Sequence, residues 1–412
     1  MNDALGPRPC GSHPFSAEIL PVIVSAWFGR LVPGRRYAVI GGVSRDAGDT
    51  ACNCVNAGGA APLQDVPSVG LSRPAIAHTR LILIGFALIL GVVAGGASAE
   101  TVRDVRLKMG SRFEVTVVHA DADRARSAIE DAYREIDRIE ALISSWRESS
   151  ETAGINRAAG VHPVTVSHEL FALIRRALKV STLTRGAFDI TFASVGRLWD
   201  FKSSVPVLPS PERLEAAMRA VGATHVVLNE ADRSVYLTHP ETRIGFGAIG
   251  KGYAANRAAA VLKDSGITSG GVNAGGDLLS FGLREDGKPR VVGVADPRRP
   301  DRTFAHLRLE NLAIVTSGDY EQFFLIDGRR YAHILDPRTG YPVDHTRSVT
   351  IICPDAELAD ALATAVFVLG PNDGLVLINE LRGVEGFLVD AAGQLRMSQN
   401  LTTLFAEEEV SP

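Results

Sequence analysis

The chain has 412 residues, of which 46% are hydrophobic and 22% are charged, a composition typical of folded globular proteins. Its length is sufficient for one large domain or two moderate ones. The formal net charge of −4 gives no electrostatic basis for binding nucleic acid or anionic lipid, so any phosphate site must be local.

An apolar segment near residue 90 has the pattern of a secretory signal peptide. Leu81–Ala94 is apolar, Arg73 and Arg80 precede it, and the small residues of Ala97–Ala99 end it. We therefore expect residues 71–99 to be a signal peptide and the protein to be periplasmic. The alternative is an uncleaved anchor in the inner membrane, because the uncharged segment is long enough to span a bilayer.

The first 70 residues show no hydrophobic periodicity. We interpret residues 1–70 as a mis-assigned or disordered leader, with translation starting near Val69 or Leu71. Three of the four cysteines lie in this leader, and Cys353 alone follows it. We predict that the folded domain spans residues 100–405 and contains no internal disulfide.

The domain begins with a hairpin pattern followed by helix patterns. Residues 103–119 alternate around a turn at Gly110, and isoleucines recur every three or four residues over 121–144, as in an amphipathic helix. Ser167 is a suitable cap for a second helix through Lys179. The other predicted elements of this half are a polar loop after Ser144, irregular backbone over 186–201, a helix over 211–221, and a hairpin of 225–228 with 234–237.

The second half mixes strands and helices without βαβ regularity or an internal repeat. The predicted elements are a helix through Lys263 that opens at a glycine-rich segment (245–253), a strand over 267–279 with a turn at 273–277, strands over 291–295 and 386–390, and helices over 357–369 and 373–381. We predict an α+β fold, a single two-lobed domain of mixed sheets and helices.

Three side chains in the second half suggest a metal and phosphate site. Asp360 and Thr364 lie four residues apart on a predicted helix, so their oxygens share one face, and such oxygens are ligands that Mg²⁺ prefers. His333 precedes a tight turn and has the ordinary pKa range of a base. The structural alternatives are a helix-start acid, a threonine bonded to its own helix, and a buried hydrogen-bonded histidine.

Two further segments suggest ligand contacts. Lys251 follows three glycines at a predicted helix start, where free N–H groups attract phosphate, although tight packing explains the glycines equally well. Asp189 lies beside Phe188 in an aromatic segment, and an acid in such a segment needs a partner.

The order of these motifs along residues 100–400 resembles the ApbE family. The motifs are MGSRF, SSW followed by Asn, GAFDIT, GAIGKGYA, NAGGDL, TSGDYEQFF, HILDPRTGYP and DALAT. Members of this family are Mg²⁺-dependent FAD:protein FMN transferases of bacterial envelopes. The resemblance implies that FAD is cleaved, that FMN is attached by a phosphoester to Ser or Thr of a membrane electron-transport subunit, and that AMP is released.

The resemblance also implies roles for individual residues. It implies Mg²⁺ ligands at Asp360, Thr364 and the main-chain carbonyl of Ala248, a base at His333, flavin contacts at Met109 and Trp146, nucleotide contacts at Ala187, Phe188 and Asp189, and a phosphate contact at Lys251. Three positions depart from the family pattern: Trp146 stands where Tyr is common, Gly245 replaces an acid, and Asn256 stands where Asp is common. The Gly245 departure puts one FAD contact in question and leaves the metal site intact.

Two other functions compete with flavin transfer. One is a periplasmic FAD pyrophosphatase, in which water replaces the acceptor hydroxyl and the products are FMN and AMP. The other is a non-catalytic flavin-binding protein. The presence of His333 together with Asp360 and Thr364 disfavours the binding protein, because binding alone requires no base.

Overall fold

The computed structural model describes residues 99–296 and 299–405, all within one compact unit. The predicted leader lies outside the described residues, as does the predicted signal peptide except for Ala99. Both therefore stay predictions.

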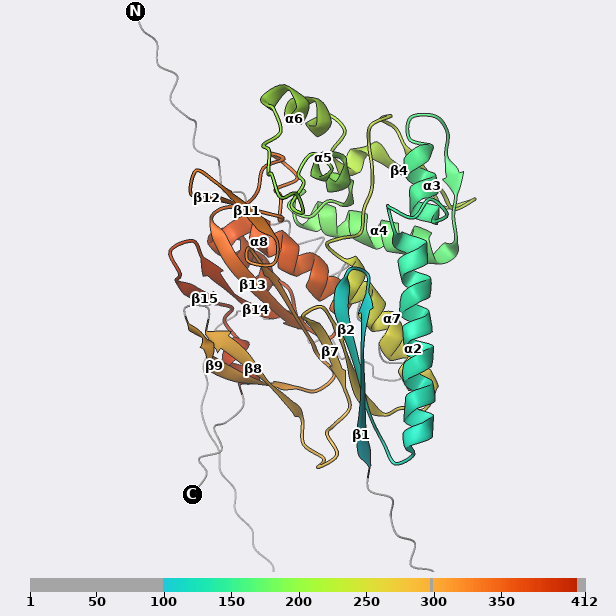
Figure 1. Cartoon of the computed structure of the whole chain (residues 1–412), viewed down its shortest axis with the longest axis vertical. Helices are drawn as coiled ribbons and strands as arrows, with labels where there is room; N and C mark the ends of the chain where they lie inside the picture. Colours follow the sequence, from blue (N-terminus) through green and yellow to red (C-terminus); the bar gives the residue numbers. More distant parts are fainter. Residues whose placement is uncertain (1–98, 297–298, 406–412) are drawn as a thin grey trace, which may run out of the picture. The chain divides into compact units, whose positions relative to one another are not determined.

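An eight-stranded antiparallel sheet forms the base of the domain (Figure 1). Its strands, in spatial order, are β1 (Glu100–Lys108), β2 (Ser111–His119), β6 (Ser269–Ala274), β7 (Asp277–Phe281), β10 (Ala313–Gly318), β13 (Thr346–Cys353), β14 (Glu385–Asp390) and β15 (Leu395–Met397). The predicted hairpin around Gly110 is confirmed as β1 and β2, and the predicted turn at 273–277 is confirmed as the connection between β6 and β7. The turn requires glycine, since Gly275 and Gly276 have φ angles of 68° and 109°.

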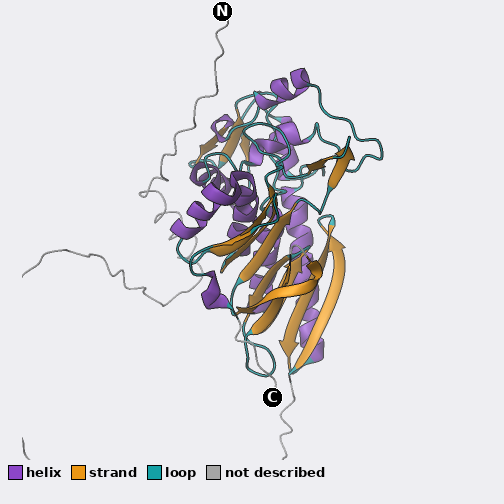
Figure 2. Ribbon diagram, turned by 90° about the vertical axis from the view of Figure 1, so that its left-hand side faces the viewer, coloured by secondary structure: helices purple, strands orange, loops and turns teal. Residues whose placement is uncertain are grey.

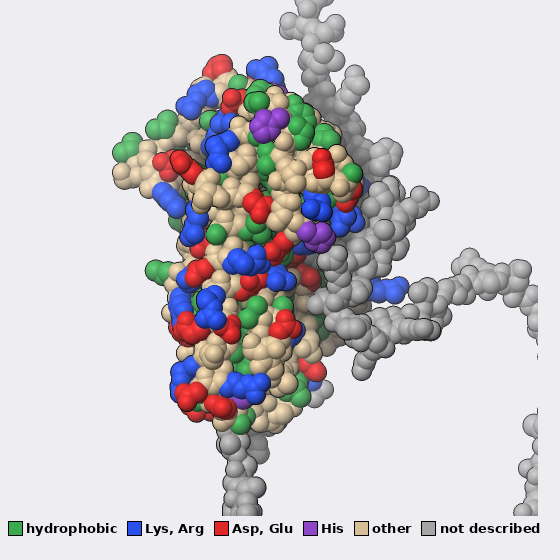
Figure 3. All heavy atoms as spheres, turned by 90° about the vertical axis from the view of Figure 1, so that its right-hand side faces the viewer, with side chains coloured by type: hydrophobic (Ala, Val, Ile, Leu, Met, Phe, Trp, Pro, Cys, Tyr) green, Lys and Arg blue, Asp and Glu red, His purple; other side chains and the backbone are tan. Residues whose placement is uncertain are grey.

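Three long helices pack on this sheet and on one another, as Figure 2 shows from a second side. They are α2 (Ala122–Ile143), α7 (Gly250–Asp264) and α8 (Ala356–Glu380). The sequence pattern of α2 explains its place, because Ile129, Ile136 and Ile139 are buried on one face. Its opposite face carries ion pairs such as Arg126 with Asp123, and Figure 3 shows acidic and basic side chains interspersed on this side of the molecule.

Smaller elements lie beyond the end of the large sheet, at the top of Figure 1. They are α3 (Glu151–Arg157), α4 (His168–Leu183), η1 (Ile190–Phe192), α5 (Ala193–Gly196), α6 (Pro211–Met218), η2 (Ala223–His225), and a three-stranded sheet of β3 (Val164–Thr165), β5 (Ser234–Leu237) and β4 (Val226–Asn229). Ser167 caps α4, as predicted. The predicted polar loop after Ser144 contains α3, and the predicted irregular segment contains η1 and α5, so both predictions missed short helices.

Two hairpins and a short turn complete the described residues. They are β8 (Arg290–Asp296) with β9 (Arg299–Leu309), β11 (Phe323–Ile326) with β12 (Arg329–Ala332), and η3 (Leu401–Leu404). The mixture of a large antiparallel sheet with packed helices confirms the predicted α+β class.

α8 contains both helices predicted for the end of the chain. Gly370 interrupts it with φ 80° and ψ −175°, and Pro371 follows, so two helical segments meet at a kink. Within the described residues this is the helix long and apolar enough to cross a membrane. It packs against β10, β13 and β14, and we assign it to the core of the domain.

The helices α7 and α8 approach each other very closely at Gly252. A Cβ atom built there would lie 2.1 Å from the carbonyl oxygen of Ala356 and 2.8 Å from Cβ of Asp360. Gly252→Ala is therefore expected to lower the unfolding free energy by about 1–3 kcal/mol or more, because a helix backbone must move. Thermal or urea unfolding measures this loss.

A matched control is Gly154→Ala in α3, where the new methyl group would meet only a guanidinium nitrogen of Arg157 at 3.9 Å. Alanine is the better helix former, so this variant is expected to be neutral or slightly more stable. Equal stability of Gly252→Ala and the wild type would contradict the close approach.

Candidate functional site

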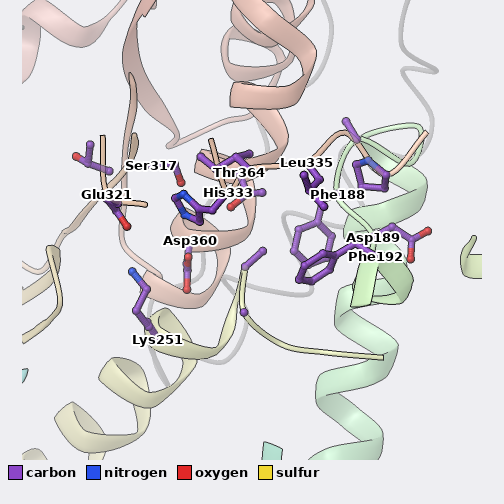
Figure 4. Close-up of a pocket in the computed structure, with 16 residues that line it drawn as sticks. Phe188, Asp189, Phe192, Lys251, Ser317, Glu321, His333, Leu335, Asp360 and Thr364 are labelled. Carbon is purple, nitrogen blue, oxygen red and sulfur yellow. The ribbon is translucent and has the colours of Figure 1, made fainter. Parts of the chain in front are cut away.

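A cavity of about 170 Å³ lies where the start of α7, the first turns of α8, the end of β10 and the loop after β12 meet. Its lining residues are Ala187, Phe188, Asp189, Phe192, Gly247, Ala248, Lys251, Thr316, Ser317, Glu321, His333, Ile334, Leu335, Pro337, Asp360 and Thr364. Figure 4 shows Lys251, His333 and Asp360 directed toward one space. The structure thus brings together all the predicted site residues except Met109 and Trp146.

Asp360 is the most deeply buried acid that lines this cavity, with 4% of its surface exposed. Its Oδ2 accepts a hydrogen bond of 2.9 Å from the backbone N–H of Gly252, which fixes the carboxylate against α7. Burial raises its pKa above the usual value, although the Lys251 ammonium opposes this effect. Thr364 follows one helical turn later and lines the same cavity, as the sequence spacing predicted.

Lys251 connects the cavity to a second buried acid, Asp277. The Lys251 ammonium lies 3.0 Å from Oδ2 of Asp277, and the Asp277 side chain is 1% exposed. Burial alone would lower the pKa of Lys251, but the charges of Asp277 and Asp360 outweigh it and raise the pKa. Lysine therefore stays cationic here, as a phosphate contact requires.

Three acids lie near the single ammonium of Lys251. Glu321 also lines the cavity, and burial raises its pKa, as does the nearby Asp360. Burial raises the pKa of Asp277 well above its usual value, and its oxygens have no hydrogen-bond partner of suitable geometry among the described residues. A divalent cation bound near these acids would stabilise their ionised forms.

The oxygen donors at this point fit Mg²⁺. The cavity is lined by Asp360, Thr364 and Ala248, which carry a carboxylate, a hydroxyl and a main-chain carbonyl. Mg²⁺ prefers a few protein oxygens completed by water or phosphate. Among the described residues there is no group of three or more His, Cys, Asp or Glu side chains arranged to hold a metal. The proposed Mg²⁺ donor set contains only one such side chain, the carboxylate of Asp360, so it is not a group of that kind.

His333 is half-buried at the end of the β11–β12 hairpin, and it also lines the cavity. Its Nδ1 lies 3.3 Å from the carbonyl oxygen of Gln322, an acceptor, so the proton is assigned to Nδ1 and Nε2 keeps a free lone pair. Burial lowers its pKa below 6.5, which keeps the ring neutral at neutral pH. A neutral imidazole with a free Nε2 can accept a proton.

Asp189 has local partners that explain an acid in an aromatic segment. Its Oδ1 accepts hydrogen bonds from the backbone N–H and the hydroxyl of Thr191, at 2.8 and 2.6 Å, and Ser181 donates to Oδ2. In Figure 4 its carboxylate points away from Asp360 and Lys251. The residue lines the cavity together with Phe188, and its carboxylate also caps η1.

A wide groove adjoins the cavity and shares Phe192, Gly247, His333 and Leu335 with it. Trp146 lines this groove, and 88% of its surface is exposed. Its ring is therefore accessible for stacking on a ligand. Met109 lines neither hollow. It sits in the β1–β2 turn, and its terminal methyl lies 3.6 Å from where a Cβ of Gly250 would be.

Comparisons with known proteins show the family of this chain. The chain matches the sequence model of the ApbE family over residues 109–389. The chain belongs to the ApbE family. A Klebsiella pneumoniae relative named FAD:protein FMN transferase is 31% identical over 307 residues, which are 73% of this chain and 87% of that protein.

Solved ApbE structures have the same fold. The ApbE protein of Thermotoga maritima aligns with a TM-score of 0.69 and 32% identity over 75% of this chain and 100% of its own. The apo flavinyl transferase ApbE of Pseudomonas stutzeri aligns with a TM-score of 0.68 and 27% identity over 75% and 98%.

The ApbE motifs also contain two acids near Lys251 that sequence patterns did not indicate. Asp277 belongs to the NAGGDL motif and Glu321 to TSGDYEQFF, and both face Lys251. The departure at Gly245 has a local reason, because a Cβ there would lie 3.1 Å from Cβ of Ala193. Gly245 lines the groove and is not among the residues that line the cavity.

Proposed function

We propose that this chain is a Mg²⁺-dependent FAD:protein FMN transferase that attaches FMN to Ser or Thr of a membrane electron-transport subunit and releases AMP. Membership of the ApbE family and the names of its relatives support flavin transfer. The observation that carries the proposal is the convergence of Lys251, His333, Asp360 and Thr364 on one cavity.

Each side chain has a role that follows from its place. Asp360, Thr364 and the Ala248 carbonyl would hold Mg²⁺, which when bound neutralises charge on the pyrophosphate. Lys251, fixed by Asp277, contacts the phosphate oxygens. These residues orient the FMN phosphorus for in-line attack.

His333 lies where the cavity meets the groove, so an acceptor hydroxyl entering from the groove can reach Nε2. As the hydroxyl oxygen bonds to the FMN phosphorus, its proton passes to Nε2 and the phosphorus–oxygen bond to AMP breaks. The products are the FMN phosphoester of the acceptor and AMP.

From the remaining predicted contacts we expect FAD to occupy both the cavity and the groove. Ala187, Phe188 and Asp189 line the cavity and would contact the nucleotide, while Trp146 on the groove would stack on the flavin. Met109, near the start of α7, would contact the flavin from the β1–β2 turn. We also propose that the protein is exported to the periplasm, because residues 71–99 have the pattern of a signal peptide.

A gel assay tests this function. Protein lacking residues 1–99 is incubated with FAD, Mg²⁺ and a membrane subunit that bears an acceptor Ser or Thr, and the gel is examined for flavin fluorescence. Fluorescence on the acceptor, with AMP in solution, is the expected result. Free FMN with an unlabelled acceptor would indicate a pyrophosphatase, and intact FAD would indicate a binding protein.

A further inference from the structure

Asn256, on the second turn of α7, makes two opposite hydrogen bonds to the start of α8. Its Nδ2 donates to Oδ1 of Asp355 at 2.9 Å, and its Oδ1 accepts from the backbone N–H of Ala356 at 3.0 Å. One atom is a donor and the other an acceptor, so a carboxamide satisfies both partners at once and an ionised carboxylate does not.

These bonds lie at the point that sets the direction of α8. Asp355 is the N-cap of α8, and the oxygen that accepts from Asn256 also accepts from the backbone N–H of Leu358 at 2.9 Å. One turn earlier in α7, Gly252 donates to Asp360. The first two turns of α8 are thus held against α7 at two points.

The proposed metal donors lie on α8 and just before α7. Ala248 lies two residues before α7, and Asp360 and Thr364 lie on α8, so the separation of the donors depends on the contact between the helices. The helices are far apart in the sequence, so the chain that connects them does not set this separation. The hydrogen bonds from Asn256 and Gly252 join the two helices beside the donors.

We propose that Asn256 is a positioning residue for the metal site, acting through the start of α8. This inference rests on the proposed function, because the site that it positions is the proposed Mg²⁺ site. It also gives a reason for asparagine at a position where the family pattern often has aspartate: a carboxylate at this position would face the carboxylate of Asp355 at hydrogen-bond distance.

Other polar groups near Asp355 make hydrogen bonds of their own. Arg176 lies close enough to interact with Asp355, but its guanidinium makes bonds of 2.7 and 3.0 Å to Glu357. The Cys353 thiol donates to the backbone carbonyl of Asp355. Burial raises the pKa of Asp355, and the bonds from Leu358 and Asn256 oppose that rise.

The test measures the Mg²⁺ concentration that gives half-maximal FMN transfer, together with the melting temperature in Mg²⁺ alone. Asn256→Ala is expected to raise the half-saturating concentration roughly tenfold or more, as loss of a group that orients a metal ligand does. Asn379→Asp is the matched control: Asn379 lies at the far end of α8, and its side-chain oxygen accepts from the backbone N–H of Gln399, a role that a carboxylate retains. It is expected to titrate like the wild type.

Asn256→Asp separates positioning from a general loss of stability. When protonated, the carboxyl group that this substitution introduces can donate to Asp355 as the amide does, so at low pH the variant is expected to approach the wild-type half-saturation. As pH rises and the shared proton leaves, its half-saturating concentration is expected to diverge from that of the wild type. Should Asn256→Ala not fold, the test is the divergence of Asn256→Asp from the wild type at the same pH as pH rises; an equal half-saturating concentration at every pH would overturn the positioning role.

The outcomes separate the two proposals. A Mg²⁺-dependent wild type whose Asn256→Ala and Asn256→Asp variants titrate identically to it would overturn the positioning role alone. A wild type with no response to Mg²⁺ in either measurement would overturn the proposed metal site and this inference with it.

Discussion

Replacing Asp360 with alanine is expected to lower Mg²⁺-dependent FMN transfer by at least about a hundredfold. Asp360 is the one carboxylate in the proposed donor set, and electrostatic stabilisation of a transferring phosphoryl group by a bound metal is worth several kcal/mol. Without it, Thr364 and the Ala248 carbonyl would offer only neutral oxygens. Initial rates measured across a Mg²⁺ titration test the expectation.

Asp360→Asn distinguishes a lost metal ligand from a damaged fold. The amide keeps the volume and an oxygen to accept from Gly252, and it removes a buried charge. The metal-free variant is therefore expected to be at least as stable as the wild type, yet to show no rise in melting temperature with Mg²⁺. Asp373→Asn, at an exposed position of α8, is the control. Full activity of Asp360→Asn would contradict the assignment of the metal ligand.

Local patterns predicted the helices and hairpins well, because the forces that set them are local. Three local signals predicted their elements: the isoleucine spacing in α2, the Ser167 cap of α4, and the turn glycines Gly275 and Gly276. The order of the eight strands has no such signal. It places β2 beside β6 and β10 beside β13, pairings that depend on packing between distant parts of the chain.

The site was predictable where one element carries two functional groups. The four-residue spacing of Asp360 and Thr364 is a property of one helix, and the structure places both on one cavity. Asp277 and Glu321 went unrecognised as neighbours of Lys251, because their segments meet it only through the tertiary fold. Asp189 differs from these two acids, because its hydrogen-bond partner Thr191 is only two residues away in the sequence.

His333→Ala is expected to slow FMN transfer by roughly 10²–10⁴ while FAD binding is retained, since the imidazole supplies a base and is one of many cavity residues. Transfer rates come from the fluorescence gel, and binding from the change in flavin fluorescence when the protein is added. His168→Ala, at an exposed position at the start of α4, is the control for loss of a histidine and is expected to behave like the wild type.

The pH profile identifies the base more specifically than the rate does. Burial lowers the pKa of His333 below 6.5, so the wild-type rate is expected to rise with pH through a pKa below 6.5 and then to level off. The sign follows from the role, because only the neutral ring accepts a proton at Nε2. The His333→Ala variant should lose this rise and keep a low rate at all pH values. If it kept the wild-type rate or the wild-type profile, another group would have to accept the proton of the acceptor hydroxyl.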